Sequence, residues 1–211
     1  MYNNVRGLKS KITSLNEILQ DNNPHLFLLT ETQLRTNTGV QIEGYIFYGR
    51  KREGMIGGGV GILVRNDIKN NTAPHISSRN IEIMWASIRR KNLPPILVGV
   101  YYGKQESRTS KNEIELEMNL LAEEIMEMSK EGEVLLAMDA NAKIGILGEE
   151  TTRNGKHILQ VFEDTNLKIM NKNEKCKGTV TRKNTKNDKE QAAIDFIVTS
   201  ENIENGSQKW K

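Results

Sequence analysis

The spacing of apolar residues predicts helices in three parts of the chain. Apolar residues recur at steps of three and four along residues 11–20 (KITSLNEILQ) and again along residues 112–132. A shorter helix is predicted for residues 155–166. The longest of these stretches closes with Lys130 and Gly132, a combination that is typical of helix C-termini.

Short apolar runs rich in β-branched and aromatic residues predict strands between these helices. Residues 81–90 and 95–102 are separated by KNLPP and predict a hairpin. In residues 54–65 a glycine-rich turn leads into a strand. The other predicted strands are residues 25–30, 45–49, 134–139, 167–171 and 192–200. Many strands with few helices favour a single α/β sandwich over residues 1–211, in which helices cover two stacked sheets.

The composition is that of an ordinary globular protein. The 211 residues are 27% charged and 36% apolar, and this length suits one large domain. The single cysteine, Cys176, excludes an internal disulfide framework and suits a reducing compartment. No apolar run approaches the roughly 20 residues that span a bilayer, and MYNNVRG is too polar for a signal peptide. We therefore expect an intracellular protein, nuclear or cytoplasmic, that is neither secreted nor bound to a membrane.

Basic residues gather in three places, although the net charge is only +3 and the pI is about 8.9. The clusters are GRKRE at residues 49–53, RRK at residues 89–91, and lysines scattered over residues 168–189. Each cluster can be an ordinary solvated surface. Three clusters on one face would instead favour a phosphate backbone as the partner. The sequence leaves both interpretations open.

Polar residues stand at, or just past, the ends of predicted strands: Asn4, Glu31, Asp139 and Asn141. Each has a purely structural explanation, because Asp and Asn favour turns and a polar residue can end a strand. Asp139 and Asn141 are two residues apart, so on an extended chain they would project to the same side. A group of carboxylates and amides suits Mg²⁺ or Mn²⁺, which would neutralise a phosphate and polarise it for attack by water.

Asp195 lies inside the apolar run AAIDFIVTS, where a carboxylate must be paired, hydrogen-bonded or bound to a cation. Other chemistries have less support. His25, His75 and His157 show no zinc-ligand spacing. The glycines of residues 57–61 precede a strand and no Gly-Lys-Ser/Thr follows them, which favours a tight turn over a phosphate-binding loop.

Several segments, in order along nearly the whole chain, resemble motifs of the endonuclease/exonuclease/phosphatase superfamily. They are NNVRGL, LLTET, GGGVGILVR, VGVYYGKQ, AMDANAKIG, NGKHILQVFEDTNLKIMN, and GTVTRKN with AAIDFIVTS. Within that superfamily, the chain is most similar to the apurinic-type endonuclease domains of non-LTR retrotransposons. The resemblance implies a DNase I-like fold, which is a four-layer sandwich of two mixed β-sheets flanked by helices.

The resemblance also implies roles for residues in these motifs. Glu31 would bind the divalent ion, Mg²⁺ or Mn²⁺, with help from Asn4. Asp139 would orient or deprotonate the attacking water, and Asn141 would steady the phosphate oxygens in the transition state. This division is chemically sensible, because a carboxylate accepts a proton while an amide donates hydrogen bonds to an oxyanion. Tyr101 takes the position of the active-site tyrosine, which contacts the scissile phosphate.

Three further positions match the family pattern. Asp195 takes the position of the aspartate that polarises a phosphate-binding histidine in relatives, so we assign it to the catalytic group. Thr179 and Arg6 lie in matching motifs and are assigned to substrate binding. The activity that the resemblance implies is nicking of a DNA phosphodiester, so that a reverse transcriptase fused to the domain can prime on the cut end.

The chain also departs from the family pattern. Met138, Gly103 and Ala192 stand where the family has Gly, Pro and Ser. The family's last strand and its Ser-Asp-His motif have no counterpart before Lys211, so we expect a domain that is incomplete at its C-terminus. Loss of the histidine donor would typically cost about 100-fold or more in rate. Three functions therefore remain open: a DNA endonuclease, a degenerate remnant that acts as a binding module, and a phosphatase on inositol phosphates or sphingolipids.

Overall fold

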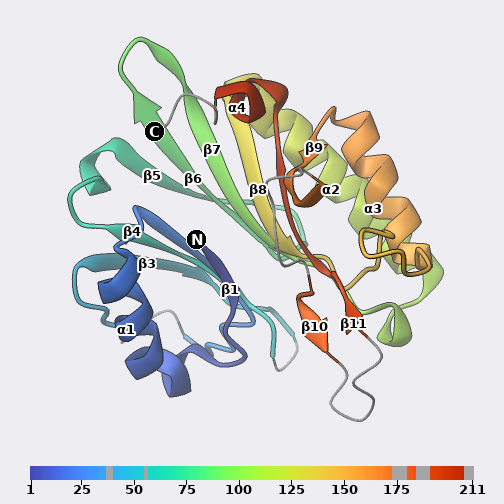
Figure 1. Cartoon of the computed structure of the whole chain (residues 1–211), viewed down its shortest axis with the longest axis horizontal. Coiled ribbons are helices and arrows are strands. Elements are labelled where there is room, and N and C mark those ends of the chain that lie inside the picture. The colour runs from blue at the N-terminus through green and yellow to red at the C-terminus, as the bar shows by residue number, and fades with distance from the viewer. Residues whose placement is uncertain (37–39, 55–56, 173–179, 184–190, 207–211) are drawn as a thin grey trace.

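The computed structural model describes residues 1–36, 40–54, 57–172, 180–183 and 191–206. It arranges them in four layers, with two β-sheets packed face to face and helices on both outer faces (Figure 1). This arrangement confirms the sandwich of two mixed sheets and flanking helices that the sequence predicts.

The first sheet has the strand order β1-β2-β4-β3. Its strands are β1 (Tyr2–Asn4), β2 (Leu26–Thr30), β3 (Tyr45–Arg50) and β4 (Val60–Arg65). β1 runs parallel to β2, while β4 is antiparallel to both of its neighbours. Helix α1 (Ile12–Asn22) covers the outer face of this sheet, and its buried Leu15 and Leu19 join one apolar cluster with Phe27 and Leu29 (Figure 1).

The second sheet has the strand order β5-β6-β7-β8-β12-β9. Its strands are β5 (Thr72–Ile76), β6 (Ile83–Arg90), β7 (Leu93–Tyr102), β8 (Glu133–Asp139), β9 (Lys168–Ile169) and β12 (Asp195–Thr199). Helices α2 (Lys111–Glu131) and α3 (Arg153–Asp164) lie on its outer face (Figure 1). The remaining described elements are β10 (Arg182–Lys183), β11 (Gln191–Ala192), α4 (Glu201–Gly206) and the 3-10 turns η1 (Leu8–Lys11), η2 (Lys69–Asn71), η3 (Glu106–Arg108) and η4 (Met170–Lys172).

Side chains on the central strands of the second sheet are buried on both faces. Successive residues of a strand point to opposite faces, so Val98 and Val100 of β7 pack between the sheets while Leu97 and Tyr101 pack under the helices. A strand covered on both faces gains from apolar side chains at every position. This is why the sequence shows continuous apolar runs here instead of alternation.

Two strands of the structure, β5 and β10, are absent from the sequence prediction. β10 has only two residues, and β5 has mostly exposed side chains and contains Pro74. A proline lacks the backbone N–H of a sheet ladder, so it is tolerated at an edge strand such as β5. The predicted strand at residues 167–171 is shorter than expected, because only Lys168–Ile169 are extended before η4.

Helix α2 begins with a capping box, in which the Ser110 side chain accepts from the Glu113 backbone N–H and the Glu113 carboxylate accepts from the Ser110 backbone N–H. This reciprocal pair satisfies two donors that helix geometry leaves free. α2 places Ile114, Leu121 and Ile125 against the second sheet. Among the described residues, no helix combines the length and the apolar character needed to cross a bilayer.

Candidate functional site

A cavity of about 420 Å³ opens where strands of both sheets end. Six of the eight residues predicted for the site line it: Asn4, Arg6, Glu31, Asp139, Asn141 and Asp195. Of the other two, Thr179 lies outside the described residues and Tyr101 does not line the cavity. The three histidines, which all fall in the described part of the chain, do not line it either.

Asn4 joins carboxylates from both sheets. Its Nδ2 donates to Glu31 Oε1 at 2.9 Å and to Asp139 Oδ2 at 2.8 Å. Glu31 follows β2 of the first sheet, whereas Asp139 ends β8 of the second. Because one amide nitrogen reaches both carboxylates, Glu31 and Asp139 face one space, as a shared ion and phosphate would require.

Glu31 is held in an uncommon backbone conformation. Its φ is +52°, in the left-handed region that side chains other than glycine rarely adopt. Backbone hydrogen bonds fix the turn around it: Gly7 N–H donates to the Glu31 carbonyl at 2.8 Å, and Thr32 N–H donates to the Gly59 carbonyl at 3.1 Å. Such a conformation costs on the order of 1 kcal/mol and persists where its surroundings enforce it. The turn aims the half-buried carboxylate into the cavity.

Asp139 and Asn141 form an Asx turn at the end of β8. Asp139 Oδ1 accepts from the Asn141 backbone N–H at 3.0 Å, and Asn141 has a φ of +46°. Asn141 therefore lies beyond the strand, and the turn, not the strand's alternation, keeps both side chains at the cavity. The Asn141 amide donates to the Gly103 carbonyl at 2.9 Å. Asp139 and Asn141 therefore serve both as turn residues and as residues of the cavity wall.

Asp139 is a buried carboxyl group with a raised pKa. Only 2% of its surface is exposed. Burial, followed by repulsion from Asp195, raises the pKa of Asp139 from 3.8 to about 7, although hydrogen bonds from Asn141 and Asn4 act in the opposite direction. Asp195 lies directly opposite Asp139 in the antiparallel pair of β12 and β8.

The Asp195 carboxylate is hydrogen-bonded, as is required of a carboxylate in an apolar strand. The Tyr2 hydroxyl donates to Asp195 Oδ1 at 2.6 Å and lies 3.0 Å from Thr30 Oγ1. Thr181 Oγ1 accepts from the Asp195 backbone N–H at 3.2 Å. Burial raises the pKa of Asp195, and the hydrogen bonds from Tyr2 and Thr181 oppose that rise.

The predicted placement of Tyr101 at the site is wrong, and its neighbour Tyr102 contacts the site residue Glu31 instead. Tyr101 is fully buried under α2, where its hydroxyl donates to Glu117 Oε1 at 2.9 Å. Tyr102 lies on the opposite face of β7, and its hydroxyl donates to Glu31 Oε1 at 3.3 Å. Tyr102 also pairs with Asp139 across the parallel strands β7 and β8, so the two side chains share a face. The family pattern fixed a position in the sequence, but the alternation of side chains along β7 decided which tyrosine contacts Glu31.

Five cavity residues were not singled out from the sequence: Tyr2, Asn3, Gln105, Thr181 and Ile194. Tyr2 is two residues before Asn4 on β1, so strand alternation places both on one face. The alternation was therefore visible in the sequence, but β1 has only three residues in which to show it. Thr181 stands two residues after the predicted Thr179, and nothing in the local pattern distinguishes them.

Arg6 supplies positive charge at the rim of the cavity. Its side chain is exposed and lines the cavity, and its backbone N–H donates to Asn4 Oδ1 at 3.3 Å. The attraction of Arg6 is one of the effects that lower the pKa of Asp195. A cation here is available to an anionic ligand.

The donor set fits a hard divalent cation that is shared with a ligand. Glu31 offers carboxylate oxygens and Asn4 an amide oxygen. Mg²⁺ is usually held by one or two carboxylates and takes water and substrate phosphate at its other positions. In the part of the chain that the structure describes, no three His, Cys, Asp or Glu side chains are arranged to hold a metal ion by themselves.

Residues 96–211, more than half of the chain, match the model of a protein family described as endonuclease-reverse transcriptase. The matched segment contains Asp139, Asn141 and Asp195. No curated protein matches the chain at a significant level.

Solved structures with the same architecture include enzymes of several kinds. The AP endonuclease LMAP from Leishmania major has a TM-score of 0.77 at 12% identity, over 95% of this chain and 78% of that chain. The 3'-5' exonuclease NExo from Neisseria meningitidis has a TM-score of 0.71 at 18% identity, over 94% and 85%. The mannosyl-6-phosphatase Bt3783 from Bacteroides thetaiotaomicron has a TM-score of 0.62 at 17% identity, over 93% and 78%. At these identities the likeness concerns the fold alone.

Proposed function

Because the chain belongs to the endonuclease-reverse transcriptase family, we propose that it is a divalent-metal-dependent phosphodiesterase that nicks DNA. The observation that carries this proposal is the contact of Asn4 with both Glu31 and Asp139, which gathers groups from two sheets around one cavity. Mg²⁺ is the proposed cofactor, and Mn²⁺ is a substitute with the same preference for oxygen ligands.

Glu31 and Asn4 would hold the ion, which when bound neutralises the phosphate and polarises it for attack by water. Tyr102 supports Glu31 by donating a hydrogen bond to its carboxylate. This bond fixes the Glu31 side chain at the wall of the cavity. Among the described residues, Glu31 Oε2 has only a long contact, from Gln33 at 3.5 Å.

Asp139 is the proposed general base. Its carboxylate accepts a proton from the attacking water, while the Asn141 amide donates to a phosphate oxygen in the transition state. Asp195, which is hydrogen-bonded by Tyr2, sits opposite Asp139. Repulsion between these carboxylates favours proton uptake by Asp139 during the reaction.

Basic side chains next to the cavity support DNA as the substrate. A second cavity of about 460 Å³ shares Glu31 and Gln105 with the first, and it is lined by five basic side chains, Arg50, Lys51, Arg52, Lys104 and Arg108, together with five glutamates, Glu31, Glu53, Glu82, Glu113 and Glu117. Lysine and arginine side chains along a groove are the usual partners of a phosphate backbone. We propose that the DNA strand passes across both cavities, with Arg6 at the far rim of the first.

The family description names a reverse transcriptase beside the endonuclease. We propose that the nick made by this chain supplies the primer end for such an enzyme, in a retrotransposon-derived protein of the non-LTR type. A nick that leaves a free 3' hydroxyl would suit this use, because polymerases extend that group.

Plasmid nicking tests the proposal. The protein is incubated with supercoiled plasmid and Mg²⁺, and the fraction of open-circular plasmid is measured against time. We expect nicking that EDTA stops and that Asp139→Ala lowers by at least about 100-fold. Asp164→Ala, which removes an exposed carboxylate at the end of α3, is the matched control and should nick at the wild-type rate. Equal nicking by Asp139→Ala would overturn the role of Asp139.

A phosphatase is the second candidate, favoured by the similarity to the mannosyl-6-phosphatase. Small phosphomonoesters, including inositol and sphingolipid phosphates, are assayed beside plasmid DNA with the same samples. Release of phosphate without nicking would replace the proposed function by this one. Binding of DNA without either activity would instead favour a binding module.

A further inference from the structure

Glu82 lies between the two sheets, beside the candidate site. It directly precedes β6, in the segment that follows β5, and its side chain is only 16% exposed. It lines the second cavity together with Glu31 and Tyr102. Nothing in the proposed reaction uses this carboxylate.

Three contacts of Glu82 connect the sheets. Its Oε2 accepts from the Gly59 backbone N–H at 2.6 Å, and its Oε1 accepts from Arg52 Nε. Its own carbonyl accepts from the Tyr102 backbone N–H at 2.9 Å. Gly59 and Arg52 belong to the connection between β3 and β4 of the first sheet, whereas Tyr102 ends β7 of the second. One residue therefore ties both sheets together where the site is assembled.

The contact with Gly59 leads to the backbone turn of Glu31. The Gly59 carbonyl accepts from Thr32 N–H at 3.1 Å, and the Gly58 carbonyl accepts from Gln33 N–H at 2.8 Å. These bonds hold the two left-handed residues of the turn, Glu31 and Gln33, whose φ angles are +52° and +51°. Glu82 thus fixes the glycine segment that supports the strained turn.

The glycines are required for this arrangement. Gly58 and Gly59 have φ angles of +62° and +85°. A Cβ at Gly58 would lie 2.5 Å from Glu82 Oε2, and a Cβ at Gly59 would lie 2.6 Å from Thr32 Oγ1. Only glycine lets Glu82 reach the segment while the segment reaches Thr32.

The contact with Arg52 leads to Glu31 by a second route. The Arg52 guanidinium lies over the Tyr102 ring, 5.2 Å from its centroid, in a cation–π contact. The Tyr102 hydroxyl donates to Glu31 Oε1. Glu82 is therefore connected to the Glu31 backbone turn through Gly59, and to the Glu31 side chain through Arg52 and Tyr102.

We propose that Glu82 is a positioning residue: it holds the Glu31 turn and Tyr102 in one geometry, so that Glu31 and Asp139 face a common cation. This inference rests on the proposed function. Groups behind a metal ligand orient it, and their loss typically weakens metal affinity or activity about 10–100-fold.

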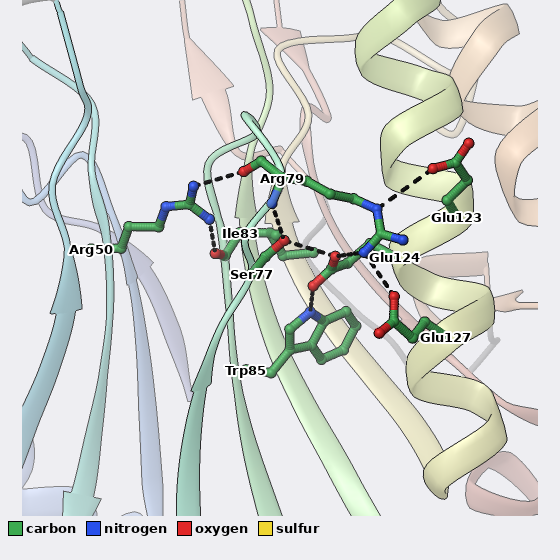
Figure 2. A network of polar contacts seen from close by, with 8 residues as sticks. All are labelled: Arg50, Ser77, Arg79, Ile83, Trp85, Glu123, Glu124 and Glu127. Atoms are coloured by element: carbon green, nitrogen blue, oxygen red, sulfur yellow. Dashed lines mark hydrogen bonds and ion pairs between the residues drawn. The ribbon is translucent and has the colours of Figure 1, made fainter.

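Glu124 is a matched control for this proposal. It is a buried carboxylate of α2 that holds the nearby segment at Ser77 and Arg79, accepting from the Ser77 hydroxyl at 2.7 Å, Arg79 Nη1 at 2.6 Å and Trp85 Nε1 at 3.1 Å (Figure 2). In Figure 2 the glutamates of α2 contact the Arg79 side chain from one side. Arg50 lies on the opposite side and donates hydrogen bonds to the Arg79 and Ile83 carbonyls. Glu124 is thus a buried carboxylate with a structural role, and its partners Ser77, Arg79 and Trp85 lie outside the Glu31 turn.

Metal binding, kinetics and hydrogen exchange together test the proposal. Mn²⁺ affinity is measured without substrate by electron paramagnetic resonance for wild type, Glu82→Ala, Glu82→Gln and Glu124→Gln. We expect Glu82→Ala to weaken Mn²⁺ binding by about 10-fold or more. Nicking should lose kcat with little change in KM, because the groups that contact DNA remain. Glu82→Gln should retain part of the function, since its amide oxygen still accepts from Gly59.

Amide hydrogen exchange in the metal-free protein gives a readout that is independent of activity. We expect Glu82→Ala to speed exchange at Thr32, Gln33 and Gly59, while Glu124→Gln leaves these amides unchanged even where it lowers the melting temperature. If Glu82→Ala does not fold, Arg52→Ala should show a smaller effect in the same direction.

The outcomes separate the two proposals. If the wild type neither binds Mn²⁺ nor nicks DNA, the proposed function fails, and exchange at Thr32 still decides whether Glu82 holds the turn. If the wild type binds and nicks, unchanged Mn²⁺ affinity in Glu82→Ala overturns the positioning role. An equal loss of affinity in Glu124→Gln would also overturn it, since general destabilisation would then explain both.

Discussion

Replacing Asp139 by Asn should stabilise the folded protein above pH 7 while it abolishes nicking. The pKa of Asp139 is raised from 3.8 to about 7 in the folded state. A carboxyl group with a raised folded pKa contributes fully to stability below pH 3.8, and this contribution is lost as the pH rises through about 7. At pH 8 the folded wild type therefore carries a buried, repelled charge that the Asn variant lacks.

The magnitude follows from the size of the pKa change. Each tenfold change in proton affinity is worth about 1.4 kcal/mol, so the full cost of ionising Asp139 is on the order of 4 kcal/mol. The variant loses part of this gain, because its NH₂ group cannot accept the hydrogen bond that Asn4 donates to Asp139. That loss is about 1–2 kcal/mol. We expect a net stabilisation of about 2 kcal/mol at pH 8, which raises the melting temperature by about 4–8 °C for a chain of this size.

Thermal and urea unfolding of both proteins between pH 4 and pH 8, in EDTA, test this expectation. At pH 4 the advantage of Asp139→Asn should vanish or reverse, because the wild-type carboxyl group is then protonated. Asp164→Asn, at an exposed position, controls for the loss of a charge. A wild-type stability that is flat between pH 5 and pH 8, with Asp139→Asn no more stable at pH 8, would refute the reasoning.

Three further predictions concern the tyrosines, a helix cap and the cation. Tyr102→Phe should lower the nicking rate about 10-fold by removing the hydrogen bond to Glu31. Tyr101→Phe should leave the nicking rate unchanged and lower the free energy of unfolding by about 1–3 kcal/mol, because the buried Glu117 loses the hydrogen bond from Tyr101. The reverse pattern in kinetics and urea unfolding would restore the prediction that Tyr101 is the site residue. Ser110→Ala should destabilise the protein by about 1 kcal/mol in urea unfolding by removing the capping box, and no change would mean that the cap is not formed in solution. Saturating Mg²⁺ should raise the melting temperature of the wild type at pH 8 but not that of Glu31→Gln, and equal rises would place the ion elsewhere.

The strands at the centre of both sheets were predictable because the same apolar residues favour extended structure locally and fill the core on both faces of the sheet. The apolar runs of β4, β6, β7 and β8 suit a strand buried on both faces. A polar residue at the end of such a run stands out, which is why Glu31 and Asp139 were found. β5 was not found, because an edge strand with Pro74 carries little apolar signal.

The choice between Tyr101 and Tyr102 needed the tertiary structure. Both faces of β7 are buried, so two adjacent tyrosines look equally suited to a core position. Which face meets the first sheet and which lies under α2 is settled only when the layers pack. The same holds for Glu82, whose partners Gly59 and Tyr102 are separated from it by many residues.

The sequence by itself determined the central strands, their polar ends and the order of the motifs, because these depend on residues that are neighbours along the chain. Only the tertiary structure decided that Asn4 touches both Glu31 and Asp139, since that contact depends on how two separate sheets stack. Packing between layers is a property of many distant side chains at once, and no local pattern records it.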